Sequence, residues 1–187
     1  MVTPELHGER IWLRPIRRTD AFALAEATNL EDETGFHEDG RVPLSILSFE
    51  SWIDGLSDAE IVFAVCRKGD DTCIGTMSIR DIDQDNGTAE TGSGLLNRAD
   101  RGQGLGTEAK QLVLRYAFEV LGLHALRSTV FEGNRRSARA LEKQGYRFAG
   151  RLTAHVLATG GVIGDALFFD ITRDDWERMG QSEMHDG

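Results

Sequence analysis

The stretch Arg101-Gly102-Gln103-Gly104-Leu105-Gly106-Thr107-Glu108-Ala109 follows a predicted strand and precedes a predicted amphipathic helix. Glycine allows positive φ and a close approach of the backbone to a ligand, and the first N–H groups of a helix have no partner inside it. A strand, a glycine loop and a helix start, in this order, form a cradle for phosphate groups. A tight structural turn is the alternative interpretation of the same glycines.

Two other phosphate-binding motifs do not fit this loop. A dinucleotide fingerprint, G-x-G-x-x-G, that starts at Gly102 and Gly104 would need a third glycine where Thr107 stands. The P-loop motif ends in Gly-Lys-Ser/Thr, which the loop lacks. The remaining pattern is R-x-x-G-x-G, formed by Arg101, Gly104 and Gly106.

Hydrophobic spacing on both sides of the loop predicts alternating strands and helices. Short β-branched or alternating runs bounded by turn residues predict strands at 11–15, 61–66, 73–82, 88–96, 125–131, 146–149, 155–158 and 166–171. Helical spacing predicts a first helix capped by Thr19 or Asp20, and further helices at 49–56, 109–121 and 134–144, the last two ended by Gly122 and Gly145. We therefore expect an α/β fold with a central mixed sheet flanked by helices.

Length and composition favour one domain that covers residues 1–187. The N-terminus lacks the basic start and apolar run of a secretory signal, and no stretch approaches the ~20 apolar residues of a membrane helix. Cys66 and Cys73 stand among apolar residues, which predicts buried free thiols and neither a disulfide nor a metal site. A cytoplasmic protein without a membrane partner is the expectation.

The charge of the chain is high and uneven. The formal net charge of −10 argues against general binding to nucleic acid, which depends on Lys and Arg neutralising phosphates. Between positions 98 and 151, however, eleven Lys/Arg stand against five Asp/Glu, a net of +6 that leaves −16 for the rest. The basic half can hold an anionic cofactor and the acidic half can face a cationic substrate, although ordinary solvated charge also accounts for the acidic half.

Further motifs along the chain repeat the pattern of one family. They are the segment from Asn134 to Tyr146 (N-R-R-S…E-K-Q-G-Y), the run Phe148-Ala149-Gly150-Arg151, the ending Asp165…Asp175-Trp176, and the opening Leu13-Arg14-Pro15…Asp20. Together with the loop, they make the chain resemble the GNAT superfamily of N-acetyltransferases, in its RimJ/RimL-type branch. The resemblance implies the GNAT fold, with a mostly antiparallel sheet, and an acetyl-CoA-dependent N-acetyltransferase.

The resemblance also implies where the acetyl donor binds. The pantetheine arm is expected to pair with the backbone at the end of the strand before the loop, and the pyrophosphate with loop amides near Arg101. Asn134 has two interpretations, a helix N-cap and a pantetheine contact. The residues implied in donor binding are Gly94, Leu95, Leu96, Arg101, Gly102, Gln103, Gly104, Leu105, Gly106, Thr107, Asn134 and Ser137.

Catalysis needs a partner for the leaving thiolate and a route for the amine proton. Leu141 stands where many GNAT enzymes carry a tyrosine acid, so the resemblance points to Ser137. Glu90 matches a general-base position, with a solvent-facing strand residue as its alternative. Asp165 is a weaker candidate for orienting the amine. The expected reaction is direct transfer in a ternary complex, without a metal.

The sequence does not decide which amine accepts the acetyl group. The branch suggests a protein or peptide N-terminus, and a small amine such as an amino-acid derivative, polyamine or antibiotic is the alternative. A non-catalytic acyl-CoA-binding domain is a further hypothesis, because Leu141 stands in place of the tyrosine acid. A nucleotide-binding protein is another, because it can use the same glycines. A homodimer is possible through strand edges near the C-terminus.

Overall fold

The computed structural model describes residues 3–30, 45–57, 59–95, 100–158 and 161–183. Its strands are β1 (Leu6–His7), β2 (Ile11–Pro15), β3 (Ile61–Arg67), β4 (Cys73–Asp83), β5 (Thr88–Leu95), β6 (Ala125–Phe131), β7 (Arg147–Ala158) and β8 (Val162–Thr172). Its α-helices are α1 (Ala21–Leu30), α2 (Ile46–Asp54), α3 (Leu105–Arg115), α4 (Arg135–Lys143) and α5 (Arg173–Glu183). A 3₁₀ turn (Arg18–Asp20) precedes α1 and a π-helical turn (Tyr116–Val120) extends α3.

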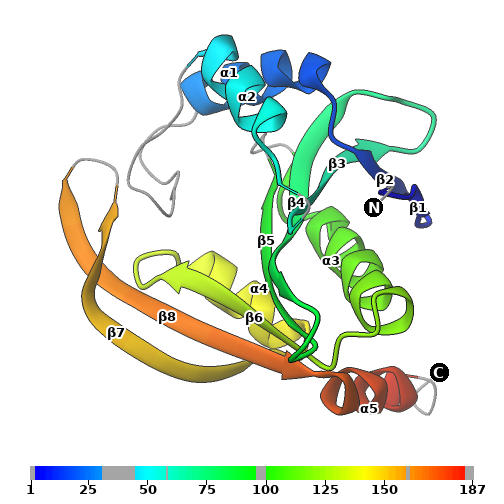
Figure 1. Cartoon of the computed structure of the whole chain (residues 1–187), viewed down its shortest axis with the longest axis vertical. Coiled ribbons are helices and arrows are strands. Elements are labelled where there is room, and N and C mark those ends of the chain that lie inside the picture. The colour runs from blue at the N-terminus through cyan, green and yellow to red at the C-terminus, as the bar shows by residue number, and fades with distance from the viewer. Residues whose placement is uncertain (1–2, 31–44, 58, 96–99, 159–160, 184–187) are drawn as a thin grey trace.

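The described strands form one sheet in the order β1-β2-β3-β4-β5-β6-β8-β7. Neighbouring strands are antiparallel except β5 and β6, which are parallel and are connected through α3. The expected mixed and mostly antiparallel sheet is therefore confirmed. The one parallel junction lies within the sheet at the start of β5, and the glycine loop follows the other end of that strand (Figure 1).

Helices cover both faces of this sheet (Figure 1). The main core lies between the sheet and the layer of α3, α4 and α5, where alternate residues of β3 such as Phe63 and Val65 meet Ala109 and Val113 of α3. On the other face, α1 packs on β3 and β4, and its Ala23 lies against the buried Cys66 and Cys73. Both layers meet β3, whose residues Ile61 to Cys66 are apolar and buried on both faces.

The C-terminal part differs most from the expectation. The predicted strands 146–149 and 155–158 are parts of one strand, β7, which is interrupted by a register shift between Leu152 and Val156. Ala154, with φ of 53°, donates from its N–H to the buried carboxylate of Asp165 at 2.9 Å. Asp165 also pairs with Arg151 at 3.0 Å, so its contacts hold this irregularity. Helix α5, absent from the expectation, follows and packs Trp176 against Phe118.

The cap expected for the first helix is also different. The buried carboxylate of Asp20 accepts two hydrogen bonds from the guanidinium of Arg14, each at 2.8 Å, and one from the N–H of Arg17 at 2.7 Å. It therefore anchors the 3₁₀ turn to β2 and does not cap α1. Among the described helices, none is long and apolar enough to cross a membrane.

Candidate active site

The glycine loop leads into α3 through left-handed backbone. Gly102 has φ of 74° and Gly104, the N-cap residue of α3, has φ of 80°. This region costs other residues about 1–2 kcal/mol, so the two glycines allow the loop its shape. Gly106 lies inside the first turn of α3. Gly102 and Gly104 therefore shape the turn, and Gly106 leaves the first turn of the helix without a side chain at that position.

The start of α3 presents N–H groups that have no hydrogen-bond partner among the described residues. The first hydrogen bond of the helix runs from the N–H of Glu108 to the oxygen of Gly104 at 3.0 Å. In the part of the chain that the structure describes, no hydrogen bond uses the N–H groups of Gly104, Leu105, Gly106 or Thr107. Unpaired N–H groups and the positive end of the helix dipole together attract an anion. These four residues are called the open turn below.

Strands β5 and β6 pair at one end only and separate toward the end of β5 that leads to the open turn. They pair only through Thr88 with Ala125, Ala89 with Leu126 and Glu90 with Arg127. Beyond these pairs β5 continues to Leu95 beside β4, and β6 continues to Phe131 beside β8. The two strands diverge from the end where they pair (Figure 1). We call this arrangement the strand fork and its closed end, at Thr91 and Ser128, the apex.

Strand alternation decides which main-chain groups face the fork. The oxygen of Thr91 accepts a hydrogen bond from Ser128 Oγ of β6 at 2.7 Å, so the main-chain groups of Thr91 face β6. Two and four residues on, Ser93 and Leu95 face the same way, because N–H and C=O groups alternate sides along a strand. By the same rule the main-chain groups of Gly94 face β4, and the predicted Leu96 lies outside the described residues. Ser93 was missed by the sequence interpretation.

The apex is closed by buried polar side chains. Thr91 Oγ1 lies 2.7 Å from both Ser128 Oγ and Tyr146 Oη, and it accepts a hydrogen bond from Lys110 Nζ at 3.0 Å. Lys110 Nζ also lies over the ring of Tyr146, 5.6 Å from its centroid. All four side chains are buried. This apex cluster joins β5, β6, α3 and the start of β7 where the two strands part.

Lys110 is the most unusual member of the apex cluster. It is 1% exposed, and burial, together with the charge of Arg80, lowers its pKa to about 7 although Glu90 acts in the opposite direction. Burial likewise raises the pKa of Tyr146 above its usual range. Sequence reasoning missed Lys110, although the spacing of 110, 113, 114 and 117 places it on the buried face of α3.

Two arginines approach each other at the mouth of the fork. The pKa of the half-buried Arg101 is lowered, first by burial and then by the positive charge of Arg136 in the first turn of α4. Like charges brought together beside the open turn raise the local positive potential, which an anion would relieve. Arg101 and the open turn therefore suit a diphosphate.

The start of α4 supplies the other predicted side chains. Asn134 Oδ1 accepts the N–H of Ser137 at 3.1 Å, so Asn134 is the N-cap of α4, and its amide NH₂ makes no hydrogen bond to the described residues. Among the described residues, no hydrogen bond engages the half-buried hydroxyl of Ser137. Leu141 lies in the main core. Both tyrosines of the chain, Tyr116 and Tyr146, are buried.

Glu90 lies on the opposite face of β5 from the apex cluster. It is 7% exposed, so it is not a solvent-facing strand residue. Its Oε2 accepts from Arg127 Nε at 2.7 Å and its Oε1 lies 3.4 Å from Arg80 Nη2. Arg127 also pairs with the exposed Asp81 at 2.9 Å. Glu90 is thus an anchored carboxylate beside the last paired residues of the fork.

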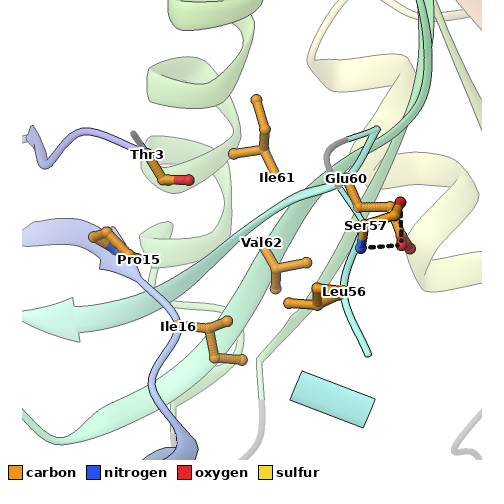
Figure 2. Close-up of a pocket in the computed structure, with 8 residues that line it drawn as sticks. All are labelled: Thr3, Pro15, Ile16, Leu56, Ser57, Glu60, Ile61 and Val62. Atoms are coloured by element: carbon orange, nitrogen blue, oxygen red, sulfur yellow. Dashed lines mark hydrogen bonds between the residues drawn. The ribbon is translucent and has the colours of Figure 1, made fainter. Parts of the chain in front are cut away.

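A separate small pocket, of 190 Å³, lies between β2, the start of β3 and the loop after α2 (Figure 2). Pro15, Ile16 and Val62 contribute much of its wall. Its single ionisable residue is Glu60, which accepts two hydrogen bonds from Ser57 at 3.0 and 3.2 Å (Figure 2). This pocket offers no cation to a phosphate, unlike the loop beside the fork.

Comparison with known proteins decides the family. A family model described as an acetyltransferase (GNAT) domain matches residues 10–147, which include the whole of the fork and the open turn. The chain belongs to the GNAT acetyltransferases. This N-acetyltransferase is 29% identical over 174 residues to the Bacillus subtilis (strain 168) protein named "Probable N-acetyltransferase YjcK", across 83% of this chain and 90% of that protein.

Solved GNAT structures share the fold. A GCN5-related N-acetyltransferase from Brucella melitensis matches with a TM-score of 0.82 and 28% identity, over 98% of this chain and 85% of that one. RimJ from Mycobacterium smegmatis, in complex with CoA-disulfide, matches with a TM-score of 0.78 and 23% identity, over 97% and 95% of the two chains. The GNAT family uses acetyl-CoA, whose diphosphate is the kind of anion that the open turn suits.

Proposed function

We propose that this GNAT enzyme transfers the acetyl group of acetyl-CoA to the amino terminus of a protein or peptide. The observation that supports the acetyl donor is the open turn, whose four N–H groups have no partner among the described residues, beside a strand fork in which β5 and β6 pair through three residues only. The open turn would bind the diphosphate. Ser93 and Leu95 would pair with the amide groups of the pantetheine arm, and Asn134 would donate a hydrogen bond from its amide NH₂ to the same arm.

The proposed reaction is a direct attack. The amine nitrogen forms a bond to the acetyl carbon, the carbon–sulfur bond breaks, and the amine loses a proton. The Ser137 hydroxyl, which has no partner among the described residues, would donate a hydrogen bond to the departing thiolate. Glu90, held between Arg80 and Arg127, would receive the amine proton through water.

Two variants test these roles. Ser137→Ala should lower kcat by about tenfold to a hundredfold with little change in the KM for acetyl-CoA, because the bond forms only as the thiolate leaves. Glu90→Gln should lower kcat by about tenfold or more, because glutamine cannot accept the amine proton. Asp81→Asn is its matched control, since Asp81 also contacts Arg127 but is exposed. An equal effect of the two substitutions would restrict Glu90 to anchoring Arg127.

The acceptor rests on the RimJ/RimL resemblance and on charge. The net charge of −10 suits a cationic acceptor, and the acidic segment 31–39 of the sequence lies outside the described residues. A small cationic amine is the second candidate, since the same charge attracts it. Mass spectrometry of products from a panel of peptides, polyamines and aminoglycosides separates the two. Faster acetylation of peptide N-termini supports the proposal, and faster acetylation of small amines overturns it.

A further inference from the structure

The outer side of the glycine loop is held by one arginine from the other end of the sequence. Arg10, in the turn before β2, donates from its Nη1 to the main-chain oxygen of Gln103 at 2.8 Å. Its Nε donates to Glu108 Oε2 at 3.0 Å, and its main-chain N–H donates to Glu108 Oε1 at 2.9 Å. Arg10 therefore contacts both the last peptide of the loop and the first turn of α3.

The bond to Gln103 fixes the direction of the next N–H. The oxygen of Gln103 and the N–H of Gly104 belong to one planar trans peptide, so they point in opposite directions. Because the oxygen faces Arg10, the N–H of Gly104 faces away from the turn between β1 and β2. This N–H is the first member of the open turn. Gly104 also leaves room for the arginine, since a Cβ there would lie 3.1 Å from Arg10 Nη2.

Glu108 completes the link to the helix. Burial alone would raise the pKa of its carboxyl, but hydrogen bonds from Arg10 and neighbouring main-chain groups hold the pKa below its usual value. The carboxylate therefore stays charged and keeps Arg10 in place. Gly8 makes space for this contact, because a Cβ at that position would lie 2.4 Å from Glu108 Oε1.

A second arginine holds the other end of the loop. Arg67, at the end of β3, pairs with the buried carboxylate of Asp100, the residue just before Arg101. Arg67 lies in register with Ile11 of β2, next to Arg10 in the sequence. The start of the loop, at Asp100, and its last peptide, at Gln103, are thus both fixed to the same end of the β2–β3 pair.

We propose that Arg10 is a positioning residue for the acetyl donor, which orients the open turn through Gln103 and Glu108 without touching the diphosphate. The inference rests on the proposed function, since it takes CoA as the ligand of the loop. A peptide flanked by glycines samples many orientations when nothing holds it, and a ligand must then order it on binding. With Arg10 in place, the N–H of Gly104 already has its binding orientation.

The test compares two acetyl donors. Acetyl-CoA has the diphosphate and S-acetyl-pantetheine lacks it. For Arg10→Ala, the Kd of CoA by calorimetry and the KM for acetyl-CoA should rise by about tenfold, which corresponds to one well-placed polar contact. Its kcat, and its kcat/KM with S-acetyl-pantetheine, should stay within about twofold. Arg18→Ala, which removes an exposed arginine paired with Glu50, is the matched control and should change neither donor.

Arg10→Lys and Glu108→Gln keep the test valid if Arg10→Ala fails to fold. A lysine side chain can reach Gln103 or Glu108 but lacks the branched guanidinium that contacts both. Arg10→Lys should therefore recover only part of the affinity for CoA. Glu108→Gln should weaken CoA binding in the same direction and by less. Unchanged CoA binding in the Arg10 variants, or an equal loss of kcat/KM with acetyl-CoA and with S-acetyl-pantetheine, would overturn this inference and leave the proposed function standing. Failure of the unmodified protein to bind CoA would instead overturn the proposed function.

Discussion

Helix α3 carries two groups of polar atoms with opposite arrangements. In the open turn, the N–H groups of residues 104–107 have no partner among the described residues. Little more than a turn further on, Lys110 belongs to the apex cluster, whose hydroxyls and lysine amine bond to one another away from water. The difference separates binding from support: donors left open await a ligand, whereas donors paired internally hold the two strands of the fork. Substitutions should therefore affect affinity at one place and stability at the other.

The largest effect is expected at the apex. Thr91→Val keeps the shape of the side chain and removes the oxygen that contacts Lys110, Tyr146 and Ser128. Buried donors without partners cost about 1–3 kcal/mol each, so the free energy of unfolding should fall by about 3 kcal/mol or more in urea titrations. Thr129→Val, in the neighbouring strand, is the control and should cost less than about 1 kcal/mol. A loss of CoA affinity without a loss of stability in Thr91→Val would contradict the supporting role given to the apex cluster.

The open turn should respond in the reverse way. Gly104→Val forces a branched side chain into a backbone with φ of 80° and against Arg10. The Kd for CoA should rise by about a hundredfold, or about 2.7 kcal/mol, because the N–H groups lose their common orientation. Gly69→Val is the matched control, since Gly69 has φ of 81° in the turn after β3 and open space around it. The free energy of unfolding should fall by about 1–2 kcal/mol in both variants. Only Gly104→Val should lose affinity for CoA.

Lysine at the apex predicts a pH dependence of stability. Its pKa is about 7 in the folded protein and about 10.4 in the unfolded chain, so above pH 7 the unfolded chain binds more protons. Stability contributed by this group therefore rises with pH. The unfolding free energy of the protein, relative to Lys110→Met, should increase by about 1 kcal/mol between pH 7 and pH 8. A flat difference would mean that Lys110 titrates alike in both states.

The smallest expected effect concerns Asn134. Asn134→Ala removes the cap of α4 and should lower the free energy of unfolding by about 0.5–1 kcal/mol. Because Asn134 is proposed to contact pantetheine as well, the KM for S-acetyl-pantetheine should rise severalfold. Ser45→Ala, which removes the cap of α2, is the control for stability. An unchanged KM would leave Asn134 as a cap alone.

Local patterns in the sequence predicted the elements that depend mainly on residues close together along the chain. Strands β2 and β6 lie at the predicted 11–15 and 125–131, and the glycine loop leads into α3 as expected. Helix α5 carried a signal that was not used: the N–H of Thr172 donates to the Asp175 carboxylate and the N–H of Asp175 donates to the Thr172 hydroxyl, which is a capping box.

Long-range contacts could not be predicted in this way. The apex cluster brings Thr91, Lys110, Ser128 and Tyr146 together from four elements, and Arg10 contacts residues more than 90 positions away. The bend in β7 depends on Asp165 of the next strand. Such pairings follow from register and helix rotation, which one sequence does not specify. For the same reason the sequence indicated Glu90 as a base without revealing its two arginine partners.

The central claim is that the open turn binds the diphosphate of the acetyl donor. A crystal structure of the protein with CoA tests it most directly. We expect diphosphate oxygens at about 2.7–3.2 Å from the main-chain nitrogens of residues 104–107, with the Gln103 oxygen still accepting the hydrogen bond from Arg10. A diphosphate bound elsewhere, or a loop whose N–H groups bond to the protein in the complex, would contradict it.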